Sequence, residues 1–150
     1  MSYAIDANVL LYASDAASAF HERAIAFLRR AAEGPELLHL PWPVVMAYLR
    51  VATDPAIFRE PLSPAEATAN VEALLRLPHV RTLGEADGFW ECWRRATRGT
   101  VVRGNLVTDA HLVAQLLQHG VATLWSHDRD FQNFDGIRVR DPFAEPHAAR

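Results

Sequence analysis

Three aspartates in this sequence occupy places where a chain selected only for folding would carry an apolar or neutral residue. Asp6 follows the apolar run 3–5, Asp109 lies inside the amphipathic segment 106–118, and Asp128 follows the apolar run 121–125, with Asp130 two residues later. Carboxylates gathered at one place repel one another, and a divalent cation removes that repulsion. Oxygen ligands without clustered histidine or cysteine favour Mg²⁺ or Mn²⁺ over zinc. The chemistry indicated is metal-assisted hydrolysis.

Asp109 is the most diagnostic of these acids because the helical pattern places it on the apolar side. At about 100° per residue it falls between Leu106, Val113 and Leu116. A buried carboxylate without a partner costs several kcal/mol, so it requires a cation, a metal or a proton. The alternative is that the helix begins at Asp109, which would then be its N-cap.

The other acids also have ordinary structural explanations. Asp6 could cap a helix or close an Asx turn, and Asp128 with Asp130 could lie in a solvated turn. Convergence favours a site, because a parallel α/β fold would bring all of these positions to one edge of its sheet.

The elements that must position these acids alternate between strands and helices. Apolar runs predict strands at 3–5, 37–40, 80–83, 121–125 and 137–139, and amphipathic segments predict helices at 18–32, 41–53, 64–77, 86–97 and 106–118. The alternation predicts an α/β three-layer sandwich with a central, mostly parallel five-stranded sheet flanked by helices. We expect one domain over residues 1–143 and a disordered tail at 144–150.

The composition excludes several other functions. All 15 basic residues are arginine, and P-loop enzymes, Schiff-base enzymes, aspartyl phosphatases and receiver domains each use a lysine. Cys92 is the single cysteine, which excludes an internal disulfide and a thiolate zinc cluster. The sequence has neither a membrane-spanning stretch nor a signal peptide, so we expect a soluble, cytoplasmic protein.

Nucleic-acid binding would have to depend on a local patch, because the net charge is −3. One ten-residue segment without an acid contains Arg94, Arg95, Arg98 and Arg103. Guanidinium groups suit phosphate, although the same residues could form a solvated helix end followed by a loop.

Aromatic and histidine side chains offer further contacts to a nucleic acid. Trp42, Trp90 and Trp93 could stack on bases if they are exposed, but tryptophans at helical spacing could equally belong to the core or to an interface. His127, beside Asp128, could support the acids by a hydrogen bond or contact a substrate phosphate.

The motifs taken together resemble the PIN domain nucleases, and among them the VapC-type toxins of type II toxin–antitoxin pairs. The resembling segments are IDANVLLYA, PWPVVMAYLRVAT, GNLVTDAHLVAQLLQHG and ATLWSHDRDF, in that order, and the resemblance covers residues 2–143. It implies an endoribonuclease dependent on Mg²⁺ or Mn²⁺ that hydrolyses RNA with metal-activated water. It also implies a cognate antitoxin as partner and a homodimer.

The resemblance also implies roles for individual residues. Asp6, Asp109 and Asp128 match the catalytic, metal-binding acids, and Asp130 matches an additional metal ligand. The polar residues Asn8, Thr108 and Ser126 match positions that support those ligands by hydrogen bonds.

One position departs from the family pattern. Many PIN domains carry a glutamate in the second of these segments, where this chain has Ala47. We therefore expect one firmly bound ion, with a second recruited by the substrate. A different function remains open, in which a catalytically weak PIN-like module binds RNA or a partner without cutting it. The absence of lysine and of a long insertion argues against a phosphatase or a flap-type DNA nuclease.

Overall fold

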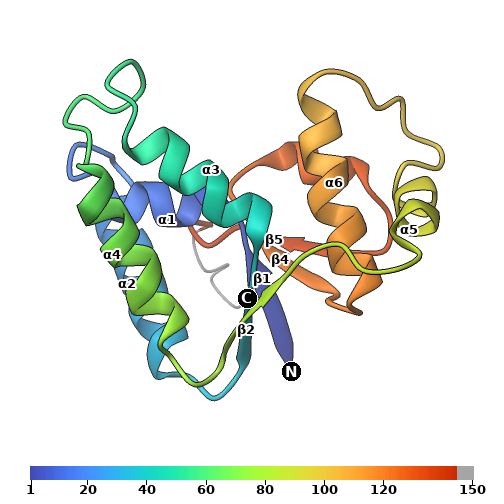
Figure 1. Ribbon diagram of the computed structural model, residues 1–150, viewed down its shortest axis with the longest axis horizontal. Coiled ribbons are helices and arrows are strands. Elements are labelled where there is room, and N and C mark those ends of the chain that lie inside the picture. Colours follow the sequence, from blue (N-terminus) through green and yellow to red (C-terminus); the bar gives the residue numbers. More distant parts are fainter. Residues whose placement is uncertain (145–150) are drawn as a thin grey trace, which may run out of the picture.

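A computed structural model describes residues 1–144, in which helices and strands alternate along the chain (Figure 1). The strands are β1 (Ser2–Ile5), β2 (Leu37–Pro41), β3 (Val80–Leu83), β4 (Thr123–Trp125) and β5 (Arg138–Arg140). The helices are α1 (Ala7–Ser14), α2 (His21–Glu33), α3 (Trp42–Ala52), α4 (Pro64–Leu75), α5 (Phe89–Ala96) and α6 (Asn105–Gln118), with a short 3₁₀ helix, η1 (Arg129–Asn133). The predicted tail, apart from Ala144, lies outside the described residues.

The five strands form one sheet in the order β3-β2-β1-β4-β5, and every neighbouring pair is parallel. β1 is the central strand, and its Ala4 and Ile5 are completely buried. The register pairs Ile5 of β1 with Trp125 of β4, so these two strands end side by side. Asp6 and Ser126, the residues that follow them, therefore leave the sheet at the same edge.

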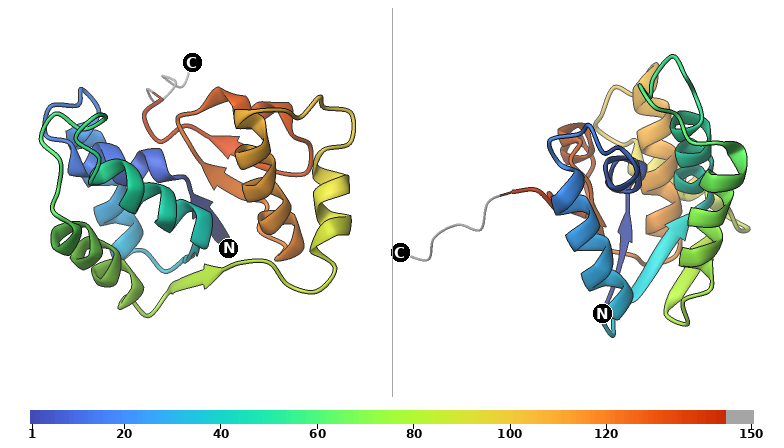
Figure 2. Two further views of the ribbon diagram at one scale, coloured as in Figure 1. Left: turned by 45° about the horizontal axis from the view of Figure 1, so that its top comes forward. Right: turned by 90° about the vertical axis from the view of Figure 1, so that its left-hand side faces the viewer.

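Helices cover both faces of the sheet, so the predicted three-layer sandwich is confirmed. α2 lies on one side of β1 and β2, and α3, α4 and α6 lie on the other (Figure 2). The central strands are consequently apolar on both faces, as expected for a parallel sheet. None of the helices within residues 1–144 combines the length and hydrophobicity that a bilayer crossing requires.

The helix boundaries follow local chemistry. Ser63 caps α4 by accepting a hydrogen bond from the Glu66 N–H, and Gly120 ends α6 in a left-handed conformation with φ +68°. The predicted helix at 86–97 is shorter than expected, because Gly88, with φ +84°, directly precedes its first residue.

α1 is a helix that the sequence pattern did not predict, since the first predicted helix begins at residue 18. The ANVLLYAS segment is too short and too uniformly apolar for its helical period to stand out. It is helical because Asp6 caps it and because its buried side chains, such as Val9 and Leu10, pack into the core. The cap explanation of Asp6 is thus correct, and it coexists with the position at the sheet edge.

Candidate active site

Aspartates from separate parts of the chain meet at the carboxyl edge of the sheet. Asp109 on α6 and Asp128 and Asp130 after β4 each present a carboxylate oxygen, and these oxygens lie within 4.8 Å of one another. We call these three residues, together with Asp6, the acidic cluster. Three oxygen donors at this spacing fit a hard divalent cation such as Mg²⁺ or Mn²⁺.

Asp6 is held beside this trio by the polypeptide around it. Its Oδ1 accepts a hydrogen bond from the Ala7 N–H at 2.7 Å, and its Oδ2 accepts one from the Ser126 hydroxyl at 2.9 Å. The buried Ser126 oxygen also accepts from Asn8 Nδ2 at 3.3 Å and from the Asp128 N–H at 3.0 Å. One hydroxyl therefore links Asp6 to the loop that carries Asp128.

Asp109 projects from the second turn of α6, which begins at Asn105, so the N-cap alternative does not apply to it. The helix places this half-buried side chain next to the core, as the sequence pattern predicted. Burial, together with the charges of Asp128, Asp6 and Asp130, raises the pKa of Asp109 from its ordinary 3.8 to about 6. Burial likewise raises the pKa of Asp6, although its hydrogen bonds from Ser126 and Ala7 oppose that shift.

These raised pKa values make the metal-free protein less stable as the pH rises from about 4 to about 6. Between those values the unfolded chain has lost the Asp109 proton while the folded chain still holds it, so ionisation favours unfolding. The shift corresponds to at most about 3 kcal/mol, and water around this half-buried group reduces the expected fall to about 1–2 kcal/mol. Urea unfolding in EDTA from pH 4 to 8 measures it. The fall in unfolding free energy between pH 4 and 6 should be absent in Asp109→Asn. An identical pH profile in that variant would contradict the attribution of the fall to Asp109.

Of the residues predicted to support the acids by hydrogen bonds, two lie in the network around Asp6 and one does not. Ser126 and Asn8 join the hydrogen-bond network, and Asn8 Oδ1 is a buried oxygen that has no partner among the described residues. Thr108 is exposed, and its side chain makes no hydrogen bond within residues 1–144. α3 contains Ala47 and no acidic residue, so this helix adds no carboxylate to the cluster.

The predicted arginine segment lies on and after α5, which packs beside α6. All four residues, Arg94, Arg95, Arg98 and Arg103, are exposed, and none forms an ion pair within the described part of the chain. Trp90 is 65% exposed and stacks on Trp93, with 6.3 Å between ring centroids. The prediction that these tryptophans could belong to the core is therefore wrong for Trp90. It is also wrong for Trp42, which is 43% exposed.

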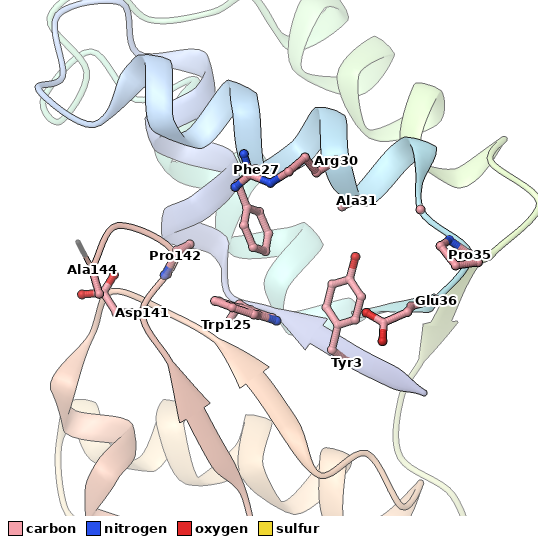
Figure 3. Close-up of a pocket in the computed structure, with 11 residues that line it drawn as sticks. Tyr3, Phe27, Arg30, Ala31, Pro35, Glu36, Trp125, Asp141, Pro142 and Ala144 are labelled. Carbon is pink, nitrogen blue, oxygen red and sulfur yellow. The ribbon is translucent and has the colours of Figure 1, made fainter. Parts of the chain in front are cut away.

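His127 has neighbours that the sequence did not reveal. Its Nδ1 lies 3.0 Å from a carboxylate oxygen of Asp141, the residue after β5, and its ring lies against Phe20 and Phe143. No motif could have identified Asp141, because its role depends on the adjacency of β4 and β5. Asp141 also lines a cavity of about 610 Å³ between α2 and the sheet, with Tyr3, Phe27 and Trp125 on its walls (Figure 3).

Residues 3–137 match the PIN domain family, and the chain therefore belongs to it. Among curated proteins, Ribonuclease VapC48 of Mycobacterium tuberculosis is 51% identical over 144 residues, which cover 96% of this chain and 99% of that protein. Ribonuclease VapC43 of the same species is 37% identical over 92% of this chain and 93% of its own length. These matches place the chain in the VapC group of the family.

Solved structures support the same fold. The Mycobacterium tuberculosis VapC20 structure, described as a sarcin-ricin loop cleaving toxin, superposes with a TM-score of 0.61 at 21% identity and covers 91% of this chain and 98% of its own. The structure of FitAB bound to a DNA fragment superposes with a TM-score of 0.63 at 18% identity, covering 99% and 100%. At such identities the likeness concerns the fold alone.

Proposed function

We propose that this protein is an endoribonuclease that depends on a divalent metal ion, and that it is the toxin of a toxin–antitoxin pair acting in the cytoplasm. The observation that carries the proposal is the convergence of Asp6, Asp109, Asp128 and Asp130 at one edge of the sheet. Kinship with proteins named ribonucleases supports RNA as the substrate. The oxygen donors and the raised pKa of Asp109 fit an Mg²⁺ or Mn²⁺ ion at this cluster.

Each residue of the cluster has a distinct task in this proposal. Asp109, Asp128 and Asp130 would hold the ion, and Asp6 would complete its ligands from the end of β1. When bound, the ion supplies a water of lowered pKa and neutralises charge on the phosphate. The Ser126 hydroxyl orients Asp6 and favours its ionised form through its hydrogen bond, and Asn8 in turn holds the Ser126 oxygen.

Cleavage of RNA by the purified, antitoxin-free protein tests this proposal. We expect cutting with Mg²⁺ or Mn²⁺, no cutting in EDTA, and recovery when the ion is restored, because the proposed attacking group is a water that the ion activates. Cleavage that persists in EDTA would contradict metal dependence. Binding of RNA without any cutting across a broad panel would favour the catalytically weak binding module instead.

The number of tightly bound ions follows from the missing acid on α3. With Ala47 in the place of the glutamate that many relatives carry, the chain has carboxylates for one complete site and only part of a second. Calorimetric titration of the free protein with Mn²⁺ should therefore give one tight site, with a second ion entering only with substrate. Two equally tight sites in the free protein would contradict this expectation.

Arg94, Arg95, Arg98 and Arg103 are proposed to bind the RNA backbone, with exposed Trp90 available for a base and His127 for a phosphate. These arginines carry no intramolecular ion pair in the described residues, so their charge is available to phosphate.

Reversing two of these charges should weaken RNA binding while the chemistry is retained. For Arg94→Glu combined with Arg98→Glu we expect the KM for RNA to rise about tenfold with little change in kcat, and the salt dependence of binding to fall by about 0.7 in log–log slope for each lost contact. Arg59→Glu, an exposed arginine between α3 and α4, is the matched control. An unchanged KM in the double variant would remove the segment from the RNA path.

An apolar groove suits the antitoxin partner. A cavity of about 520 Å³ between α1, α2, α3 and α4 is lined mainly by aliphatic side chains, among them Leu10, Ile25, Leu28 and Leu74. Such a groove accepts the apolar face of a partner helix, and a basic side chain of the same partner could neutralise the acidic cluster. We also propose a homodimer, for which Trp42 and Met46, 43% and 54% exposed and one turn apart on α3, offer an apolar contact.

A further inference from the structure

The segment that follows β5 lies beside His127, in the loop that carries Asp128 and Asp130. Both carboxylate oxygens of Asp141 lie close to His127 Nδ1, at 3.0 and 3.1 Å, and one of them also accepts from the Phe143 N–H at 2.8 Å. A carboxylate only accepts, so His127 Nδ1 is the donor. Arg23 on α2 donates to the Phe143 carbonyl at 3.0 Å. Figure 3 shows Asp141 and Pro142 beside the end of the sheet. We call residues 141–143 the strap.

Aromatic rings pack against the partly exposed His127 side chain. Its ring centroid lies 4.6 Å from that of Phe20, 5.3 Å from that of Phe143 and 6.1 Å from that of Tyr12. Phe20 and Phe143 stack on each other at 5.0 Å, and Phe143 is buried. The strap thus supplies both the acceptor for the His127 nitrogen and one wall of the ring's surroundings. The hydrogen bond to Asp141 sets the orientation of the imidazole ring, and the neighbouring rings set its position.

His127 is the residue between two parts of the acidic cluster. Ser126, before it, donates to Asp6, and Asp128, after it, accepts from the Asp130 N–H through its side chain at 2.9 Å. The Ser126 N–H is itself bonded to the carbonyl of Arg140, the last residue before the strap, at 2.9 Å. A rotation of the backbone at His127 would therefore move the Ser126 hydroxyl and the Asp128 carboxylate together.

We propose that the strap positions the acidic cluster, with Asp141 and Phe143 holding His127 and, through it, Asp128 and Asp130 in the arrangement that binds a divalent ion. Asp141 and Phe143 are positioning residues that need touch neither the ion nor the RNA. The catalytic consequence depends on the proposed function, whereas the consequence for ion binding does not.

Four variants of the full chain test the proposal: Asp141→Ala, His127→Phe, the two combined, and Asp141→Asn. His127→Phe keeps an aromatic ring among its neighbours and removes the Nδ1 donor together with the second ring nitrogen, Nε2. Asp141→Asn removes the charge but keeps an acceptor oxygen for His127. Asp135→Ala is the control, an exposed acid between η1 and β5 whose side chain makes no hydrogen bond within residues 1–144. The readouts are Mn²⁺ affinity from electron paramagnetic resonance of the free ion, kcat and KM for RNA, and the thermal unfolding midpoint.

Both Asp141→Ala and His127→Phe should lower Mn²⁺ affinity and kcat about tenfold or more, as expected when a group that orients ligands is lost. KM should stay unchanged in Asp141→Ala, whose side chain has no proposed contact with RNA. The combined variant should be no worse than either single one, because both remove the same contact. Asp141→Asn should recover most of the affinity, and Asp135→Ala should match the unaltered chain. Losses that simply add would mean that Asp141 and His127 act independently, and no recovery in Asp141→Asn would assign the effect to charge alone. Either result would overturn the proposal.

The unfolding midpoint separates positioning from support of the fold. A lower midpoint in Asp141→Ala with unchanged Mn²⁺ affinity would make the strap a structural element only, which also overturns the proposal. If the unaltered chain binds Mn²⁺ but cuts no RNA, the proposed function fails while the Mn²⁺ measurements still decide the role of the strap. An unaltered chain that binds no Mn²⁺ would overturn both.

Discussion

Replacing Asp109 with asparagine is expected to reduce RNA cleavage about 10³-fold or more while the protein remains folded. The substitution removes one of the three carboxylates whose oxygens lie within 4.8 Å of one another, and the only one of them supplied by α6. Stabilisation of transition-state charge by a bound metal is worth several kcal/mol, and about 1.4 kcal/mol corresponds to a tenfold change in rate. The measurement is the cleavage rate of one RNA substrate at saturating Mg²⁺.

Stability gives this prediction an internal control. A neutral amide at this position would avoid both the burial of a charge and the repulsion by Asp128, Asp6 and Asp130, which together raise the pKa of Asp109. Asp109→Asn should therefore be as stable as the unaltered chain, or more so, at pH 7 in EDTA. A loss of activity with retained or increased stability therefore cannot be attributed to unfolding. Asp135→Asn, at an exposed acid between η1 and β5 whose side chain makes no hydrogen bond within residues 1–144, should cleave normally. Full activity in Asp109→Asn would move the reaction away from the acidic cluster.

The residues of the candidate site were easiest to predict where a carboxylate stands at a position that the surrounding pattern would assign to an apolar side chain. Asp109 stands out because the apolar side of its long helix can be identified from the spacing of the apolar residues. In the structure its half-buried side chain lies on that side of α6. Asp6 and Asp128 could be located because a short apolar run ended immediately before or nearly before each of them. The parallel order of β1 and β4 then accounts for their proximity.

Other features could not be predicted from the spacing of residue types along the chain, because they depend on contacts between residues distant in sequence. α1 has no alternating polar side, so its helix is visible only once Asp6 is seen to cap it. Asp141 lies 14 residues from His127, and no spacing rule connects them. Ser126 was predicted as a supporting residue from family resemblance, but that one hydroxyl joins Asp6, Asn8 and the Asp128 backbone follows only from the three-dimensional arrangement.

Because the Ser126 hydroxyl joins these groups, we expect the second large loss of activity when Ser126 is replaced with alanine. The variant leaves Asp6 Oδ2, Asn8 Nδ2 and the Asp128 N–H without their shared partner in a site where Ser126 is only 2% exposed. Loss of the hydrogen bond that opposes burial would raise the pKa of Asp6 further, so less of it would be ionised to bind an ion. Losing a group that orients metal ligands typically costs 10–100-fold in affinity or activity, and we expect a loss of about that size.

A stability loss alone could mimic this result, so a second serine provides the comparison. Ser14 on α1 shares a hydrogen bond of 2.8 Å with the buried Tyr48 hydroxyl, away from the acids. Ser126→Ala should cost about 1–3 kcal/mol in unfolding free energy, because it leaves partly buried polar groups without their shared partner. Ser14→Ala should cost about 0.5–1.5 kcal/mol, because the Tyr48 hydroxyl still accepts a hydrogen bond from Asn70 Nδ2. Only Ser126→Ala should lower kcat and Mn²⁺ affinity, and its activity should recover in part as the pH rises and Asp6 ionises. Equal activity in the two variants would mean that Ser126 supports the fold and leaves the ionisation of Asp6 to its other neighbours.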